Sequence, residues 1–202
     1  MCKNKQQARK GVHYFMKKLL FALGTLALLG ILMLAFAVGA YNTLNRQDEK
    51  INQAFAQVEN QLKRRNDLIP NLVSATKGYV AHEQEVFKAI ADARAKMGGA
   101  KTDLDKMKAG NEMTSALSRL MVIVENYPNL KADSQFLQLS DELAGTENRI
   151  AVARMDYNKS VEVLNGKVRT FPSNVIAGVF NIGKRDYFET PETEKAVPKV
   201  EF

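Results

Sequence analysis

The chain has few of the residues from which metal sites and disulfide-stabilised folds are built, with one cysteine and two histidines in 202 residues. With Cys2 alone, it can form no internal disulfide and no thiolate cage for a metal ion. His13 and His82 lie on opposite sides of a long apolar run, so they cannot share a site. His82 and Glu83 look like the start of a zinc-protease helix, but Val86 occupies the position of the second histidine ligand. We therefore predict no metal, no cofactor and no catalytic residue.

Charged side chains are absent from one stretch and unevenly spread over the others. Residues 1–18 contain six Lys or Arg and no acid, and residues 19–40 contain no charged side chain at all. The other 23 basic residues are balanced by all 22 acidic residues of the chain. A nucleic-acid-binding domain would concentrate its positive charge on the folded part. The net charge of +7 lies almost wholly in the N-terminal tail, so we predict no nucleic-acid partner, and no motif identifies a small-molecule substrate.

The uncharged run of 22 residues at 19–40 predicts a transmembrane helix. A helix of that length covers about 33 Å, against a hydrocarbon thickness of roughly 30 Å. The alternative is a cleaved signal peptide, but the apolar core of such a signal is only about 7–15 residues long. Positive charge before the span predicts a cytoplasmic N-terminus and a bundle on the outer side of the membrane. A start at Met16 instead of Met1 would leave two positive residues on each side and remove this bias.

Apolar residues at alternating steps of three and four predict helices in the rest of the chain. One series runs through residues 41–97, and Pro70 should kink or break its helix near Ile69, with a further helix to about Lys96. Gly98 and Gly99 should end that helix. The polar stretch that follows, up to Gly110, is typical of an exposed loop.

Two further helices are expected. One starts after Asn111 and stops at Pro128, and another runs from about Ser134 to Thr170, with apolar residues up to Phe171 on its inner face. Alternating strand patterns are absent. The predicted fold is all-α, with a single N-terminal transmembrane helix followed by an antiparallel, four-helix bundle with long kinked helices. The expected divisions are a basic tail (1–18), a transmembrane helix (19–40), the bundle (41–174), an apolar segment (175–190) and a flexible tail (191–202).

Five stretches in a fixed order closely resemble the LemA family: 61–73, 77–83, 124–128, 145–154 and 171–174. The resemblance implies a bacterial protein with one N-terminal span in the cytoplasmic membrane and a four-helix bundle. It implies no established enzymatic activity or cofactor. One branch of the family is associated with intracellular membrane organisation in magnetosome-forming bacteria, and other members with envelope maintenance, which for this chain is analogy.

Nine polar residues of these stretches are candidates for a site inside the bundle: Arg64, Arg65, Asp67, Glu125, Asn126, Glu147, Asn148, Arg149 and Arg154. Arg65 falls on the apolar seam of its helix. An anion or peptide site is one hypothesis. We favour a hydrogen-bonded structural network that fixes helix register, because no nucleophile, metal cluster or glycine-rich phosphate loop accompanies these charges.

The C-terminal region contains two candidate contact segments. The apolar segment 175–183 either enters the membrane surface or caps the open end of the bundle, and its candidate lipid contacts are Val175, Ile176, Val179, Phe180 and Ile182. The other segment is the last three residues, Val200, Glu201 and Phe202. They resemble peptides captured by PDZ-type grooves, although an ordinary tail is the simpler interpretation.

These observations favour a non-enzymatic, membrane-anchored helical scaffold or adaptor of the bacterial cell envelope, which binds envelope proteins or its own copies. The alternative is a membrane-shaping or membrane-organising protein whose apolar C-terminal segment contacts lipid. Lipid binding separates the two hypotheses.

Overall fold

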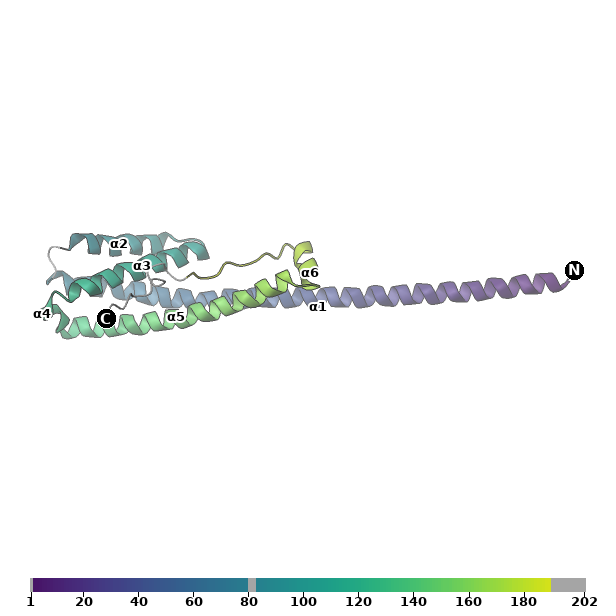
Figure 1. Ribbon diagram of the computed structural model, residues 1–202, viewed down its shortest axis with the longest axis horizontal. Coiled ribbons are helices and arrows are strands. Elements are labelled where there is room, and N and C mark those ends of the chain that lie inside the picture. The colour runs from purple at the N-terminus through teal and green to yellow at the C-terminus, as the bar shows by residue number, and fades with distance from the viewer. Residues whose placement is uncertain (1, 80–82, 190–202) are drawn as a thin grey trace, which may run out of the picture. The chain divides into compact units, whose positions relative to one another are not determined.

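The structure is a computed structural model that describes residues 2–79 and 83–189, with side chains from Met16 onward. Six helices and no strand occupy the described residues (Figure 1), which confirms the all-α prediction: α1 (Cys2–Lys77), α2 (Gln84–Gly99), α3 (Asp103–Val124), α4 (Pro128–Lys131), α5 (Ser134–Arg169) and α6 (Ser173–Val179).

The chain divides into two compact units. The anchor unit comprises Met1–Arg46 and Lys167–Gly183, and the bundle unit comprises Gln47–Gly166 and Lys184–Phe202. Both α1 and α5 contribute residues to each unit.

In the anchor unit, α1 contains a candidate membrane span. It is the one helix among the described residues that is long and apolar enough to cross a bilayer, and its most apolar stretch is not covered by any other part of the protein. Phe21 is 76% exposed, Ile31 64% and Leu34 67%. Large apolar side chains exposed around a whole helix are stable in hydrocarbon and not in water. The helix is therefore a single N-terminal membrane anchor.

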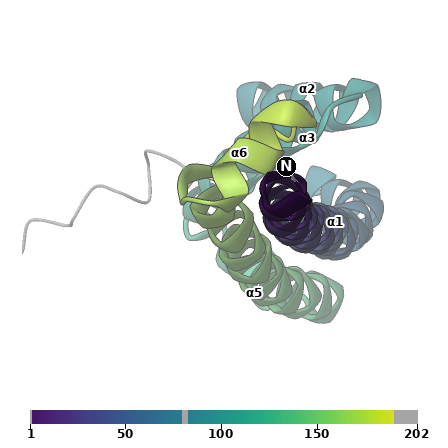
Figure 2. The same ribbon diagram turned by 90° about the vertical axis from the view of Figure 1, so that its right-hand side faces the viewer.

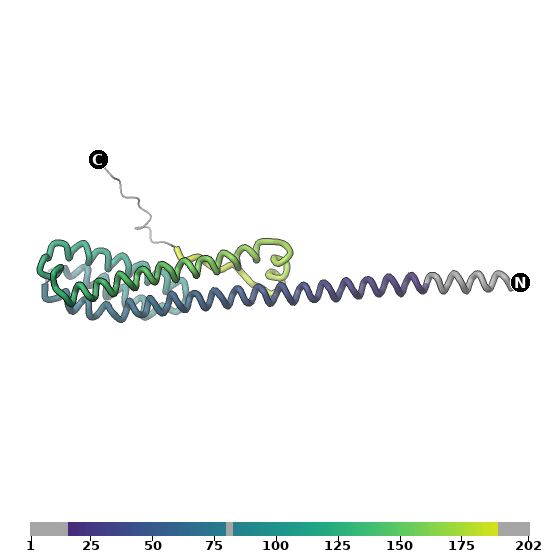
Figure 3. The backbone as a smooth tube through the Cα atoms, turned by 90° about the horizontal axis from the view of Figure 1, so that it is seen from below, coloured from purple at the N-terminus to yellow at the C-terminus, as the bar shows by residue number. Residues whose placement is uncertain are grey.

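The bundle unit is built from the second part of α1 and from α2, α3 and most of α5. Helix α2 packs on α3, α3 packs on α1, and α5 runs alongside α1 in the opposite direction (Figures 2 and 3). One core cluster contains residues of all four helices and of α4: Ile69, Leu72, Ile90, Ala93, Met113, Ala116, Leu117, Leu120, Val124, Leu130, Phe136, Leu139 and Leu143.

The seam predicted for α1 is confirmed over the bundle. Each of these seam residues is at most 4% exposed: Ile51, Phe55, Val58, Leu62, Arg65, Ile69, Leu72 and Thr76. A seam of this length keeps one face of α1 against its neighbours over about seven helical turns, at 3.6 residues per turn.

Of the kink or break predicted near Ile69, the break is wrong, because α1 continues through Pro70 to Lys77. A proline inside a helix costs about 3 kcal/mol. The flanking Ile69 and Leu72 are 1% and 0% exposed, and each buried side chain of this size contributes about 1.5–3 kcal/mol. Core packing therefore holds this turn helical. The chain leaves the helix at Gly78 instead, so the helix expected to end near Lys96 is the separate α2.

The exposed loop predicted up to Gly110 is also wrong, because α3 begins at Asp103. Thr102 is its N-cap and accepts a hydrogen bond from the backbone N–H of Asp105 at 3.1 Å. Acidic residues in this first turn suit the positive end of the helix dipole. Gly110 lies inside α3, where a Cβ atom would come within 3.0 Å of Leu62. The glycine therefore allows α3 to approach α1 closely.

The last long helix is confirmed, since α5 covers Ser134–Arg169. Helix α3 ends at Val124, and Pro128 begins the short helix α4. The placement of Phe171 on the inner face is wrong, because α5 ends before it and its side chain is 82% exposed.

Candidate functional site

Arg65 is the centre of the polar network predicted inside the bundle. Its side chain, 2% exposed, donates a hydrogen bond to the Thr114 hydroxyl at 2.8 Å and another to the Gly110 carbonyl at 3.0 Å. Its guanidinium also forms an ion pair with Glu147 of α5. One side chain thus joins α1, α3 and α5.

The charge of Arg65 depends on this pairing. Burial lowers the pKa of the guanidinium, and the carboxylate of Glu147 opposes that shift. Arginine stays protonated at any physiological pH, so the bundle contains a buried cation whose single ionic partner among residues 16–79 and 83–189 is Glu147. An apolar groove of about 530 Å³ on the α3 and α5 surface exposes part of this pair: its lining includes Leu117, Met121, Leu143, Ala144 and Glu147.

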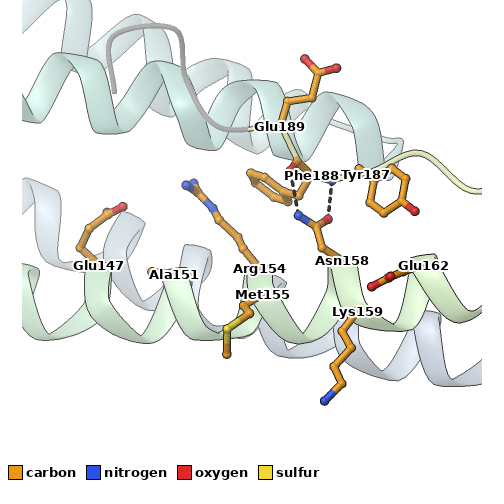
Figure 4. A pocket seen from close by; sticks show the side chains of 10 residues that line it. All are labelled: Glu147, Ala151, Arg154, Met155, Asn158, Lys159, Glu162, Tyr187, Phe188 and Glu189. Atoms are coloured by element: carbon orange, nitrogen blue, oxygen red, sulfur yellow. Dashed lines mark hydrogen bonds between the residues drawn. The ribbon is translucent and has the colours of Figure 1, made fainter. Parts of the chain in front are cut away.

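Of the nine predicted polar residues, Arg65 and Glu147 form an ion pair with each other. Arg64 and Arg149 line a shallow groove with Asp141 and Glu142. Arg154 lines the cavity of Figure 4, and Glu147 lines the same cavity. The others are exposed at the surface, where Glu125 pairs with Lys131: Asp67, Glu125, Asn126 and Asn148.

Sequence reasoning missed an extended strap, which we define as residues 184–189 of the bundle unit. The side-chain amide of Asn158 accepts from the Phe188 N–H at 2.7 Å and donates to the Phe188 carbonyl at 3.0 Å (Figure 4). Asn165, two helical turns further along α5, makes the same reciprocal pair with Arg185, both bonds at 2.9 Å. The two asparagines thus bind the strap backbone as a neighbouring strand would.

Side chains of the strap hold it further. Arg185 donates to both carboxylate oxygens of Asp48, at 2.8 and 3.0 Å, and this raises the pKa of its guanidinium. Phe188 is 5% exposed and lies under the guanidinium of Arg154, 4.3 Å from the ring centre. No periodicity reveals such a strap, because its partners are single polar side chains on α5 and not an apolar seam.

Tyr157 binds the strap, and its ionisation lowers the stability of the fold at high pH. Its hydroxyl donates to the Asp186 carbonyl at 3.0 Å, and burial, with Asp103 as a second cause, raises its pKa above the ordinary value of 10.0. Below about pH 10, Tyr157 is protonated in both the folded and the unfolded chain and does not change the free energy of unfolding. Above that pH, the tyrosine of the unfolded chain loses its proton first, so the free energy of unfolding falls. Wild-type protein should therefore lose stability from pH 10 upward more steeply than Tyr157→Phe, as followed by urea unfolding at each pH. Parallel pH curves for the two proteins would contradict this.

In the anchor unit, the predicted lipid contacts lie on and just after α6. Three are exposed, Val175 by 54%, Val179 by 69% and Phe180 by 51%, whereas Ile176 and Ile182 are half-buried. Ala177 alone is buried, and it faces inward. The exposed side chains form an apolar surface, which we call the α6 surface: Phe171, Val175, Val179 and Phe180.

Hydrogen bonds at both ends fix α6. The Ser173 hydroxyl donates to the Lys167 carbonyl at 2.8 Å, which ties the start of α6 to the end of α5. At the other end, Asn181 adopts a left-handed conformation with φ of 54°, and the Ile182 N–H donates to the Ala177 carbonyl at 2.9 Å. This is a helix C-cap of the type that left-handed residues form. It directs Phe180 toward α1, where its ring lies 4.4 Å from that of Tyr41.

The C-terminal candidates Val200, Glu201 and Phe202 lie outside the described residues. Within the described part of the chain, no group of three or more His, Cys, Asp or Glu side chains is arranged to hold a metal ion.

The fold and these contacts define a class of protein, a helical bundle joined to a single N-terminal membrane anchor. Residues 54–202 match the sequence model of the LemA family, and the chain belongs to that family. It is similar to Protein LemA of Metamycoplasma hominis, at 27% identity over 190 residues, which cover 93% of this chain and 85% of that protein.

Two magnetosome proteins are also similar. Magnetosome protein MamQ 2 of Paramagnetospirillum magneticum is 26% identical over 175 residues, which cover 74% of this chain. Magnetosome protein MamQ of Magnetospirillum gryphiswaldense is 26% identical over 174 residues, which cover 73%. In both comparisons the match covers 64% of the relative, less than two thirds of its length.

Proposed function

We propose that this LemA protein is a non-enzymatic organiser of the bacterial cytoplasmic membrane, with the α6 surface as a second lipid contact beside the span. The observation that carries this proposal is the contact of Phe180 with Tyr41, whose ring centroids lie 4.4 Å apart at a tilt of 44°. Tyr41 is the first residue after the predicted span 19–40. If that span crosses the bilayer, the α6 surface lies at the boundary between hydrocarbon and water.

The composition of the α6 surface suits that boundary. Phe171, Val175, Val179 and Phe180 are each more than half exposed, and exposed apolar groups at the headgroup level gain about 25 cal/mol per Å² when lipid covers them. An element on one leaflet occupies area there and not on the other, which favours bending. Relatives named as magnetosome proteins support a role in membrane organisation. The N-terminus would lie in the cytoplasm and the bundle outside.

A second candidate function is that of an adaptor that binds an envelope protein or another copy of the chain. The apolar groove between α3 and α5 favours it, because Leu117, Met121 and Leu143 lie around the partly exposed Glu147. Quantitative crosslinking of full-length protein in intact membranes, followed by identification of the partner, tests this function. A chain that ends at Lys199 would show whether the last three residues contribute.

The lipid contact is tested with the full chain carrying Cys2→Ser and Val179→Cys, labelled with an environment-sensitive fluorophore and reconstituted in phosphatidylcholine vesicles. The label should emit at shorter wavelength and be quenched by lipids with a nitroxide near the headgroup. Val122→Cys is the matched control, since Val122 on α3 is 71% exposed and Val179 is 69% exposed. Equal emission and quenching at both positions would overturn the proposal.

A further inference from the structure

We propose that the anchor unit binds anionic phospholipid headgroups through Arg46, Lys167 and Arg169. The inference rests on the proposed lipid contact of the α6 surface and names the lipid class that this contact selects.

Charge outside the N-terminal tail is segregated between the two units. The bundle unit has 20 basic and 22 acidic residues, whereas residues 41–46 and 167–183 contain three basic residues and no acid. Arg46 and Arg169 are exposed and Lys167 is half-buried. A protein surface usually mixes both signs of charge. The part of the anchor unit that follows the span instead carries positive charge only.

The three cations lie close to the α6 surface along the chain and in space. Lys167 and Arg169 belong to the last turn of α5, and the Lys167 carbonyl accepts the hydrogen bond from Ser173 at the start of α6. Arg46 lies five residues after Tyr41 on α1, about 7.5 Å along the helix axis at 1.5 Å per residue. The ring of Phe180 contacts that of Tyr41, so we infer that the cations lie on the water side of the predicted span.

That depth is where headgroup phosphates lie. Arginine binds phosphate through paired N–H donors, and lysine binds it as a point charge. Each basic residue near an anionic membrane surface adds about fivefold to binding, so three add roughly 100-fold at low salt. An apolar contact combined with basic residues gives stable association with a bilayer, where either alone is marginal.

The test compares the association of spin-labelled phosphatidylglycerol and phosphatidylcholine with the reconstituted full chain. Wild-type protein should prefer phosphatidylglycerol, and Arg46→Gln/Lys167→Gln/Arg169→Gln should lower that preference by at least about fivefold, the contribution of one basic residue. Its control, Lys88→Gln/Arg94→Gln/Arg119→Gln, removes the same charge from exposed residues of the bundle unit and should keep the preference. Arg46→Lys/Arg169→Lys retains the charge and should also keep it. Salt at 0.5 M should weaken the preference, whereas millimolar inorganic phosphate should not.

The N-terminal tail contributes equally in all these variants, so their differences report on the anchor unit. An unchanged preference in the triple Gln variant, or its loss in added phosphate, would overturn this inference. If the Val179 label is inserted while the preference is unchanged, the lipid contact stands and only its headgroup selectivity fails. If the label is not inserted, the proposed function fails with it.

Discussion

Replacement of Glu147 by alanine is expected to lower the free energy of unfolding of the bundle by about 2–4 kcal/mol. Removal of one member of a buried ion pair commonly costs about 3–5 kcal/mol, because the remaining charge stays buried without its partner. Arg65 fits that case with a side chain 2% exposed, whereas the Glu147 side chain is 37% exposed. Water can therefore partly replace the lost carboxylate, and the expected cost is reduced accordingly.

The measurement is urea unfolding of full-length protein in detergent, followed by far-ultraviolet circular dichroism. Glu112→Ala is the control, because Glu112 pairs with Lys96 at 2.7 Å and both side chains are about half exposed or more, at 48% and 61%. Loss of such a surface pair costs about 0–1 kcal/mol. Equal losses for Glu147→Ala and Glu112→Ala would show that burial of Arg65 has no energetic consequence.

A double variant separates structure from function at this pair. Arg65→Met/Glu147→Leu leaves no charge buried, and buried pairs replaced by apolar residues of similar volume are often neutral or stabilising by about 1–4 kcal/mol. We expect it to regain most of the stability lost in Glu147→Ala. Retained stability together with lost membrane organisation in cells would instead favour an anion or peptide site at Glu147.

The position of Arg65 on the seam could be read from the sequence, but its partners could not. Period alone places residue 65 between Leu62 and Ile69 on the buried face. The contacts that satisfy its charge come from Gly110 and from Glu147, which is 82 residues away in the chain. Such pairing depends on how α3 and α5 pack, and no local pattern records it.

Local rules failed where tertiary packing or capping opposed them. Pro70 did not break α1, because Ile69 and Leu72 are held in the core. The polar residues after Gly99 suggested a loop, yet Thr102 followed by acidic residues is the signature of a helix N-terminus. The strap could not be predicted from the sequence, because Asn158 and Asn165 bind its backbone atoms. Backbone atoms are the same in every residue, so no pattern of side chains marks such a contact.

The apolar segment after α5 was recognised from composition, but which of its side chains are exposed was not. The sequence left lipid contact and bundle cap equally open. Val175 and Val179 are 54% and 69% exposed, and exposed apolar side chains of this kind are available to lipid. The tilted ring contact between Phe180 and Tyr41 supports our proposal of a lipid contact.

Val179→Asp is expected to shift the α6 surface out of the membrane. The change removes an apolar side chain that lipid would cover, worth about 1–2 kcal/mol, and adds a carboxylate that resists transfer from water. A combined cost of about 3 kcal/mol corresponds to a change of roughly 100-fold in the ratio of inserted to withdrawn α6. The span and the bundle core do not include Val179, so anchoring and helix content should stay unchanged.

The consequence of that shift is measured on vesicle shape. Wild-type protein reconstituted at increasing density should produce vesicles of decreasing diameter in cryo-electron micrographs, and Val179→Asp should leave the diameter near that of lipid alone. Val122→Asp places the same charge at a valine of nearly equal exposure, 71% against 69%, and should behave as wild type. A second matched pair, Val175→Asp and Val152→Asp, repeats the comparison at 54% and 55% exposure. The two members of each pair differ in the unit that carries the aspartate. If both members abolish the curvature, a charge at any exposed valine disturbs the protein. The α6 surface would then have no special role in bending the membrane.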